Sequence, residues 1–323
     1  MNKQYLIEKW AKGFCKLYEK PDLMRSPEEI WIATMAHCSS IGEAIRKYDF
    51  VELMDYAARS FCWMLSFSMK CAKTKELLFR CENTFCEMVY LKFPERCGHC
   101  THDVCQCDPS EMDAKKDKAG HYRESLEIWK RNQRGIKYNI NDWLTIFTKI
   151  YSGRIHLQTM ETLGFHFLEE AGEETAAIRK LMQLRGVVCN GVSGLDEKLK
   201  ELVTIPQITN EYIRLSTGQL DGKPHIDLTS NKPDDIYARI VSAKMDLVVE
   251  LADTFSFFCS ILIKLGNVTI EKGTSFVTNL EEILIKKYGT PDKGLVCPSC
   301  RDKACKCVFY SKSAHSQNQR AGI

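Results

Sequence analysis

Hydrophobic residues recur at the spacing of α-helices along most of the chain. The segment from Val51 through Met69 is apolar and rich in aromatic residues, which predicts a buried helix. A similar segment runs from Lys244 to Leu265, and the Gly266-Asn267 pair after it predicts a C-cap. Ser26-Pro27-Glu28-Glu29 is typical of a helix start, and Asn279 to Lys287 is amphipathic with lysines in its last turn. These patterns predict an all-α fold.

Three polar stretches interrupt the helical pattern. Residues 108–120 are highly charged, which is typical of a linker or a solvated helix. Residues 185–235 are rich in glycine and proline and include the β-prone run Val203-Thr204-Ile205, so they predict an irregular insertion, with a hairpin near Asp221-Gly222. The tail after Tyr310 is polar and is predicted to be disordered.

One cysteine spacing, C-x2-C-x4-C-x-C, occurs twice in the chain. A Lys-aromatic segment precedes each copy, Lys92-Phe93-Pro94 in one case and Lys287-Tyr288-Gly289 in the other. The two sets of four are Cys97, Cys100, Cys105 and Cys107, and Cys297, Cys300, Cys305 and Cys307. Because so specific a spacing recurs about two hundred residues later, the sequence indicates a tandem duplication.

The duplication predicts two helical modules, each ending in a small four-cysteine metal-binding knuckle. We expect a first module at 1–108, a linker at 109–125 and a second module at 126–310 that carries an insertion at about 184–243. Residues 311–323 form the predicted tail.

Each cysteine set has the number and type of ligands that a structural zinc site needs. Four thiolates close a tetrahedral sulfur site and leave no coordination position open for catalysis, so we predict two structural Zn²⁺ ions in preference to iron–sulfur clusters. Basic residues near the ligands leave contact with nucleic acid as a less favoured alternative; they are His99, His102, Arg301, Lys303 and Lys306. The other eight cysteines fall mostly on apolar helical faces and are predicted to be packing residues.

The bulk composition is that of an ordinary globular protein. The 45 basic and 42 acidic residues give a net charge of +3, and without a long basic run nucleic acid is not the expected partner. Met1 to Lys20 is typical of an amphipathic helix and not of a secretory leader. The longest apolar stretch, Phe255 to Ile263, is shorter than the roughly 20 residues that span a bilayer. We therefore expect a cytoplasmic protein with no membrane contact.

Two pairs of acids in the second half are spaced to share a helix face. Glu170 and Glu173 are three residues apart, and so are Glu250 and Asp253, which lie in an apolar helix. Buried carboxylates need a compensating charge, and two such pairs on facing helices suit a hard cation, Mg²⁺ or Mn²⁺. The alternative is a solvated acidic face, since Glu-x-x-Glu is common on helices.

These acids carry a resemblance to a known family. Glu169-Glu170-x-x-Glu173 followed by Glu250-x-x-Asp253 resembles the signature of the MazG-like all-α nucleoside triphosphate pyrophosphohydrolases, over about residues 155–182 and 244–290. The chain departs from that family in the long segment from Leu184 to Ala243 between the two acidic motifs.

The resemblance implies a fold, an activity and roles for residues. It implies hydrolysis of a (d)NTP to a (d)NMP and pyrophosphate, with Mg²⁺ held by Glu170, Glu173, Glu250 and Asp253. Glu169 would act as general base or outer-shell ligand. Lys264 and Lys287 are candidates for substrate binding by position only.

The first half aligns with the second but lacks part of this acid set. Val51 to Asp55 matches Val249 to Asp253, so Glu52 and Asp55 are kept, as is Glu43. Ser39 and Ser40 fall opposite Glu169 and Glu170. We interpret the first half as a degenerate copy that pairs with the second within one chain, and a homo-oligomer stays open. The alternative function is a catalytically inactive, zinc-stabilised module that binds nucleotide or nucleic acid.

Overall fold

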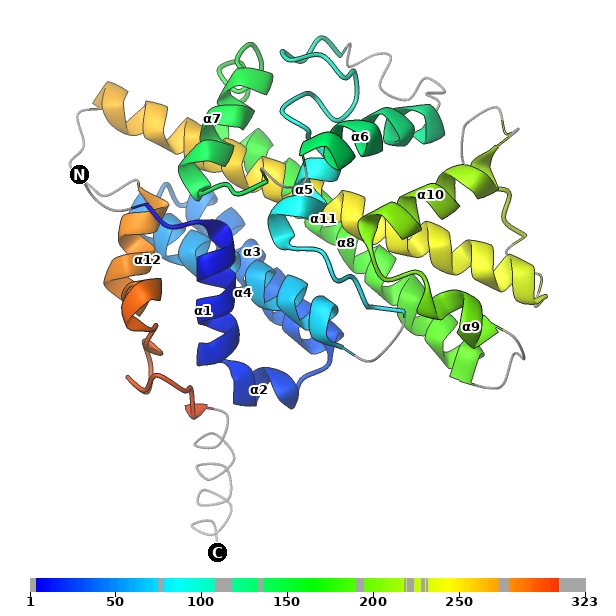
Figure 1. Cartoon of the computed structure of the whole chain (residues 1–323). Helices are drawn as coiled ribbons and strands as arrows, with labels where there is room; N and C mark the ends of the chain where they lie inside the picture. The colour runs from blue at the N-terminus through cyan, green and yellow to red at the C-terminus, as the bar shows by residue number, and fades with distance from the viewer. Residues whose placement is uncertain are drawn as a thin grey trace, which may run out of the picture.

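The computed structural model describes residues 4–74, 78–107, 118–132, 136–189, 195–217, 219, 224–227, 230, 232–272 and 279–307. Within these ranges the chain forms helices and no strand, and the closest approach to β-structure is one isolated bridge between Leu6 and Asn139 (Figure 1). The predicted all-α fold is confirmed. None of the helices in the described ranges combines the length and the apolar character that crossing a bilayer requires.

Four long helices form the centre of the molecule. α3 (Pro27–Arg46) packs against α4 (Phe50–Lys73), and α8 (Met160–Cys189) packs against α11 (Pro233–Lys272). The two pairs meet where α3 lies against α8. Glycines allow this close approach: a Cβ atom at Gly42 would lie 2.9 Å from Leu168 Cδ1, and one at Gly164 would lie 2.8 Å from Ile45 Cδ1.

Shorter helices flank each central pair. α1 and α12 pack against α4, whereas α5, α7 and α10 pack against α11. Their bounds are α1 Ile7–Leu17, α2 Glu19–Leu23, α5 Phe85–Lys92, α6 Lys118–Asn132, α7 Ile140–Ile150, α9 Leu195–Lys200, α10 Ile205–Ser216, α12 Leu280–Tyr288 and the 3₁₀ turn Pro291–Lys293. Thus α5, from the first half of the sequence, lies on the long helix of the second half, and α12 lies on that of the first (Figure 1).

The two halves repeat the same local packing. In α1 the rings of Trp10 and Phe14 stack with centroids 5.8 Å apart, and in α7 those of Trp143 and Phe147 stack at 5.6 Å. Phe14 also meets Tyr288 edge-on at 5.0 Å, as Phe147 meets Phe93 at 5.2 Å. The division into modules at 1–108 and 126–310 stays a prediction, but these repeated contacts agree with duplication.

Helix starts follow the sequence closely, whereas one predicted end is wrong. Ser26 caps α3 through a capping box with Glu29, as predicted. α11 continues through Gly266-Asn267 to Lys272, so the predicted C-cap there is wrong. A glycine inside a helix costs only about 1 kcal/mol, which the hydrogen bonds of a long helix outweigh.

The predicted irregular insertion is largely helical. α8 extends to Cys189, and α9 and α10 lie within residues 195–216. The β-prone run Val203-Thr204-Ile205 leads into α10, where the N–H of Thr204 donates to Gln207 Oε1 at 3.0 Å. Three apolar residues of α10 are buried: Ile205, Ile208 and Tyr212. The predicted hairpin near Asp221-Gly222 and the tail after Tyr310 lie outside the described residues.

The charged segment between the halves is partly helical. Residues 108–117 lie outside the described ranges, and α6 begins at Lys118, inside the predicted linker. α6 packs on α5 and α10 with Tyr122, Leu126 and Trp129 buried. It is therefore part of the packed structure, with one solvated face.

Candidate metal centres

Three of the predicted acidic ligands converge between α8 and α11. Carboxylate oxygens of Glu170, Glu173 and Glu250 all lie within 4.8 Å of one another. Glu170 and Glu173 share a face of α8 because they are three residues apart, and α11 packs along that face. Glu170 and Glu250 are half-buried, whereas Glu173 is exposed. The cluster is thus open to solvent on one side, and its spacing fits oxygen ligation of one hard cation.

Asp253, the fourth predicted ligand, already has a partner. Its carboxylate accepts a hydrogen bond from Lys92 Nζ of α5, and both residues are buried. Burial opposes a charge on Lys92, but the negative charges of Asp253 and Glu250 outweigh it and raise the pKa of the lysine. A cation from the first half of the chain therefore sits in the acidic cluster of the second.

Burial disfavours ionisation of Glu170, Glu250 and Asp253 when no metal is bound. Burial, reinforced by the charge of Asp253, raises the pKa of Glu170 to about 8. Burial also raises the pKa of Glu250 to about 7, and that of Asp253 rises for the same reason despite Lys92. The site therefore favours protons or a cation over bare negative charge.

Glu169 lies outside the cluster, and Glu174 is a neighbour that the sequence did not single out. Glu169 is exposed, with Oε2 3.1 Å from Nδ1 of His166. Glu174 is fully buried, and neither of its carboxyl oxygens has a hydrogen-bond partner among the described residues. Burial raises its pKa well above the usual value, although the neighbouring Thr254 hydroxyl acts in the opposite direction.

The first half has no comparable acid cluster among its described residues. Glu43 is exposed and pairs with Lys47 at 2.7 Å, while Asp55 is held by Lys287 and Arg59. The hydroxyl groups of Ser39 and Ser40 donate back to the main chain of α3 at 3.0 Å. These contacts agree with a degenerate copy of the acidic motif.

The two candidate substrate lysines lie apart from the acidic cluster. Lys287 Nζ donates to Asp55 in the first half, so it is the counterpart of Lys92. Lys264 Nζ donates to the main-chain oxygen of His156 at 3.2 Å. The residue in the expected position is Lys92, which the sequence marked only through the Lys-aromatic pair that precedes each cysteine set.

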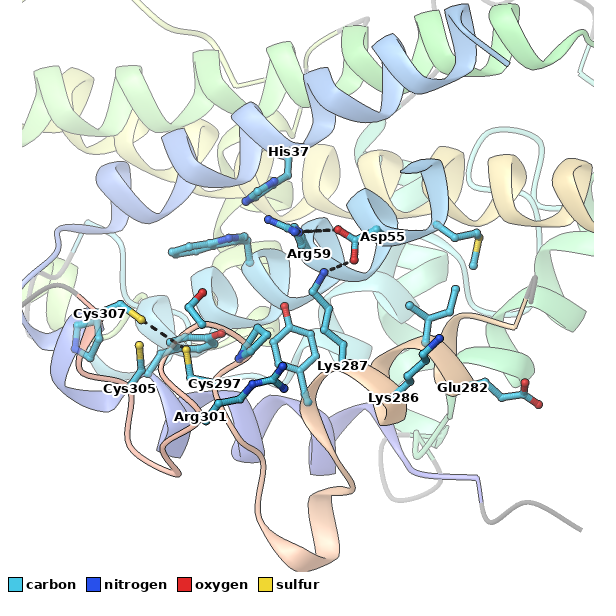
Figure 2. Close-up of a pocket in the computed structure, with 18 of the residues that line it drawn as sticks. His37, Asp55, Arg59, Glu282, Lys286, Lys287, Cys297, Arg301, Cys305 and Cys307 are labelled. Atoms are coloured by element: carbon cyan, nitrogen blue, oxygen red, sulfur yellow. Dashed lines mark hydrogen bonds and ion pairs between the residues drawn. The ribbon is translucent and has the colours of Figure 1, made fainter. Parts of the chain in front are cut away.

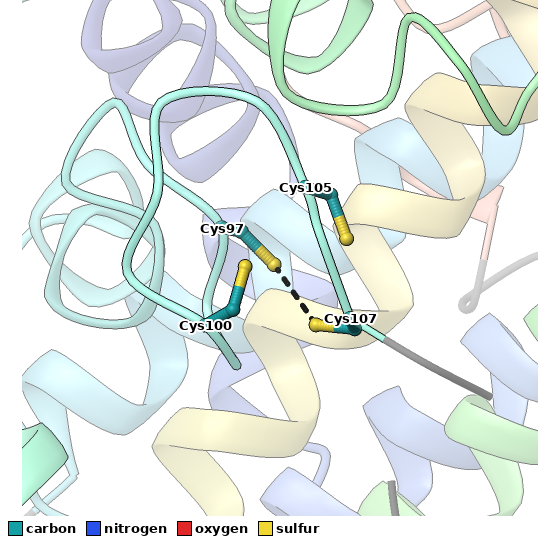
Figure 3. Close-up of side chains that lie close together, drawn as sticks. All are labelled: Cys97, Cys100, Cys105 and Cys107. Carbon is teal, nitrogen blue, oxygen red and sulfur yellow. Dashed lines mark hydrogen bonds between the residues drawn. The ribbon is translucent and has the colours of Figure 1, made fainter. Parts of the chain in front are cut away.

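Each set of four cysteines forms a compact cluster. All four Sγ atoms of a set lie within 4.8 Å of one another, and Figure 3 shows how the first set converges. The Sγ atoms of Cys97 and Cys107 are 3.7 Å apart, and those of Cys297 and Cys307 are 3.6 Å apart. Tetrahedral coordination with a zinc–sulfur bond of about 2.3 Å separates the sulfurs by about 3.8 Å. The structure thus confirms two four-cysteine sites that could hold metal ions such as zinc.

The backbone of the two clusters is the same. The N–H of Cys97 donates to His102 O and that of Cys297 to Asp302 O, both at 2.9 Å, and Thr101 and Arg301 have φ values of 58° and 61°. Without a metal the thiols of a cluster differ in pKa: the N–H of Lys306 lowers the pKa of Cys300 to about 7, whereas burial raises the pKa of Cys305 and that of Cys97. A metal ligand must be deprotonated, so binding of a metal ion would displace protons from the buried thiols.

The clusters are exchanged between the halves. The N–H of Cys105 donates to the oxygen of Ile150 at the end of α7, and the N–H of Cys305 donates to Leu17 at the end of α1, both at 2.7 Å. Each cluster therefore caps the C-terminal end of a helix of the other half, α7 in one case and α1 in the other.

The other cysteines mostly pack in the core, as predicted. Five of the eight are fully or almost fully buried in helices, and Cys81 is buried beside them: Cys38, Cys62, Cys71, Cys81, Cys86 and Cys259. Cys15 is half-buried and Cys189 is exposed at the end of α8.

Comparisons with known proteins give no assignment. No protein-family model matches the chain, and neither the curated proteins nor the solved structures contain a match. Function therefore has to be argued from the sites themselves.

Proposed function

We propose that the protein is a divalent-metal-dependent nucleoside triphosphate pyrophosphohydrolase that cleaves a (d)NTP to the monophosphate and pyrophosphate. The observation that carries this proposal is the convergence of Glu170, Glu173 and Glu250 within 4.8 Å. Such an all-oxygen donor set suits Mg²⁺ or Mn²⁺. An ion of this kind, when bound, polarises phosphoryl oxygens and lowers the pKa of a coordinated water.

The surrounding residues have distinct tasks in this reaction. Lys92 holds Asp253 in place and offsets the negative charge of the cluster. In the reaction, the oxygen of water bonds to the α-phosphorus while the bond from that phosphorus to the bridging oxygen breaks, and pyrophosphate leaves. Glu169 stays the predicted acceptor of the water proton, although its exposed carboxylate lies outside the cluster, with Oε2 3.1 Å from Nδ1 of His166.

The two halves supply a matched pair of variants for the test. Pyrophosphate release is measured with Mg²⁺ over a panel of NTPs and dNTPs for the wild type, Glu173→Gln and Glu43→Gln. Loss of a metal ligand removes several kcal/mol of stabilisation, so Glu173→Gln should lower turnover about 100-fold or more. Glu43→Gln, at the equivalent exposed position, should keep wild-type turnover. Equal turnover in all three proteins would remove the acidic cluster from the mechanism.

One observation favours a second function, that of an inactive nucleotide- or nucleic-acid-binding module. Lys92 already supplies a cation to Asp253, so the cluster is partly neutralised without a metal. Under this alternative the chain would bind a nucleotide with one-to-one stoichiometry and leave it intact. A single-turnover incubation analysed by chromatography separates the two functions, since only the hydrolase converts bound triphosphate to monophosphate.

A further inference from the structure

A cavity of about 870 Å³ lies between helices of the first half and the C-terminal part of the second, around α12 and the second cysteine cluster. Its walls come from α3, α4 and α12, from the chain around α2, and from the second cysteine cluster (Figure 2). Asp55, the counterpart of Asp253, lines it together with Lys287. Its volume falls in the range of about 300–1,000 Å³ that is usual for small-molecule sites.

The cavity is basic, unlike its acidic counterpart. Five arginine and lysine side chains, one histidine and two carboxylates line it: Arg25, Arg59, Lys286, Lys287 and Arg301, with His37, Asp55 and Glu282. Lys287 and Arg59 both reach Asp55, which neutralises part of this charge (Figure 2). Lys286 and Arg301 are exposed and form no ion pair with the residues that the structure describes. An excess of positive charge therefore faces the cavity.

Aromatic side chains form one wall of the same cavity. Trp63 is half-buried and stacks near Tyr18, with ring centroids 6.3 Å apart. The guanidinium group of Arg25 lies 5.2 Å from the centre of the Trp63 ring. Tyr288 of α12 also lines the cavity. A ligand in this place meets both cations and aromatic surface, the two features that bind an anion attached to a flat ring.

Two cavity-lining residues of α4 differ in chemical character from the residues at the aligned positions of α11. With Glu52 and Asp55 aligned on Glu250 and Asp253, Arg59 corresponds to Phe257 and Trp63 to Ile261.

Cavity-lining residues of α12 and of the second cysteine cluster also differ from their counterparts in the first half. With the Lys-aromatic pairs aligned, Lys286 corresponds to Leu91. With the cysteine sets aligned, Arg301 corresponds to Thr101, which has the same positive φ. Carboxylates line the acidic cluster, whereas this cavity brings together arginine, lysine and tryptophan side chains from both halves of the chain.

We propose that this cavity is a second, metal-independent site that binds a free nucleoside polyphosphate. Arg301, Lys286 and Arg59 bind the phosphates, because guanidinium and ammonium groups neutralise them without a bridging cation. The base lies against Trp63. The site does not depend on the hydrolase activity proposed above, since none of its residues belongs to the cluster of Glu170, Glu173 and Glu250.

The test measures nucleotide binding by the zinc-loaded full chain in buffer without added Mg²⁺ or Mn²⁺. Calorimetric titration is done with ATP, GTP, CTP, UTP and inorganic tripolyphosphate. The double variant Lys286→Gln with Arg301→Thr removes two exposed cations, and it places at 301 the residue that the first cluster has at Thr101. Lys198→Gln with Lys200→Gln, on exposed α9 lysines, is the control with the same change of net charge.

The expected result is one-to-one binding of at least one nucleotide by the wild type and the control. The Lys286/Arg301 variant should bind that nucleotide at least tenfold more weakly, and Glu173→Gln should bind it as the wild type does. Trp63→Leu should weaken binding of the nucleotide but leave that of tripolyphosphate unchanged. The proposal is overturned if the wild type binds no nucleotide under these conditions. It is overturned equally if the Lys286/Arg301 variant matches the control, or if Glu173→Gln abolishes binding.

Discussion

Lys92 of α5 and Asp253 of α11 form a buried ion pair that links the two halves of the sequence. The same relationship recurs in reverse, with Lys287 of α12 bonded to Asp55 of α4. Each half thus supplies a lysine to the acidic helix of the other. The two pairs differ in burial: side-chain exposure is 7% and 11% for Lys92 and Asp253 but 13% and 41% for Lys287 and Asp55. The more buried Lys92–Asp253 pair is therefore expected to affect the free energy of unfolding more than the Lys287–Asp55 pair.

Replacing Lys92 should destabilise the protein much more than replacing Lys287. Removing one partner of a buried pair leaves an uncompensated charge and costs about 3–5 kcal/mol, whereas a partly exposed pair contributes about 1 kcal/mol or less. Lys92→Met and Lys287→Met are compared by urea denaturation. Adding Asp253→Asn to Lys92→Met should recover a large part of the loss. Equal destabilisation by the two lysine variants would contradict the expected difference between the two ion pairs.

The metal-free protein should lose stability as the pH rises. Glu170 and Glu250 have an ordinary pKa of 4.5, but in the folded chain these values are about 8 and about 7. The folded state therefore binds more protons than the unfolded state between those limits, and stability falls from about pH 4.5 through about pH 8. Thermal melts over this range, with and without Mg²⁺, measure the effect.

Two comparisons make the pH prediction specific. Glu170→Gln with Glu250→Gln should flatten the decline, because neither amide titrates. Mg²⁺ should stabilise the wild type most at the upper end of the range, where the carboxylates that ligate it are ionised. A wild-type profile identical to that of the double variant would show that these groups titrate normally.

The two cysteine clusters should each hold one zinc ion. Elemental analysis of the purified chain is expected to find two zinc ions per chain, and Cys100→Ser or Cys300→Ser should each reduce the content to one. Because metal binding is coupled to folding, strong chelators should lower the melting temperature. Retention of both ions in either serine variant would argue against the four-cysteine assignment.

Glu174 should be replaceable by an apolar residue with a gain in stability. Burial of a polar group without a hydrogen-bond partner costs about 1–3 kcal/mol in proteins. Glu174→Met keeps a similar size and is therefore expected to raise the free energy of unfolding by about this amount. The exposed variant Glu173→Met serves as the control and should change stability by less than about 0.5 kcal/mol. A loss of stability in Glu174→Met would mean that the acid is needed for packing or ligation.

Local signals in the sequence predict much of the fold. Ser26 and Asn279 are followed by helices at the predicted positions because capping and amphipathic spacing depend only on near neighbours. The prediction of an irregular insertion at 185–235 was wrong because it used only the local glycine and proline content. Some of its glycines and prolines lie inside helices, as Gly186 does in α8 and Pro206 in α10. The sequence pattern did not indicate that Ile205, Ile208 and Tyr212 are buried and that α10 packs on α11.

The acidic site, too, was predictable only where neighbouring residues in the sequence form it. The spacing of Glu170, Glu173 and Glu250 predicts shared helix faces, and the structure brings these three together. Lys92 is 161 residues from Asp253, and only the crossing of α5 onto α11 unites them. The hydrophobic pattern does not indicate that a lysine of one half pairs with an acid of the other half. The only related feature of the sequence is that Lys92-Phe93 recurs as Lys287-Tyr288.

The hydrogen bonds from Cys105 to Ile150 and from Cys305 to Leu17 have a consequence for dissecting this protein. A fragment cut between the halves would keep its own cysteine ligands but lose the helix end that they cap. It would also expose the apolar surfaces of α4 or α11 that the missing segment covers. The halves are therefore expected to become soluble and ordered only when produced together, as complementary fragments that assemble by exchanging their C-terminal ends.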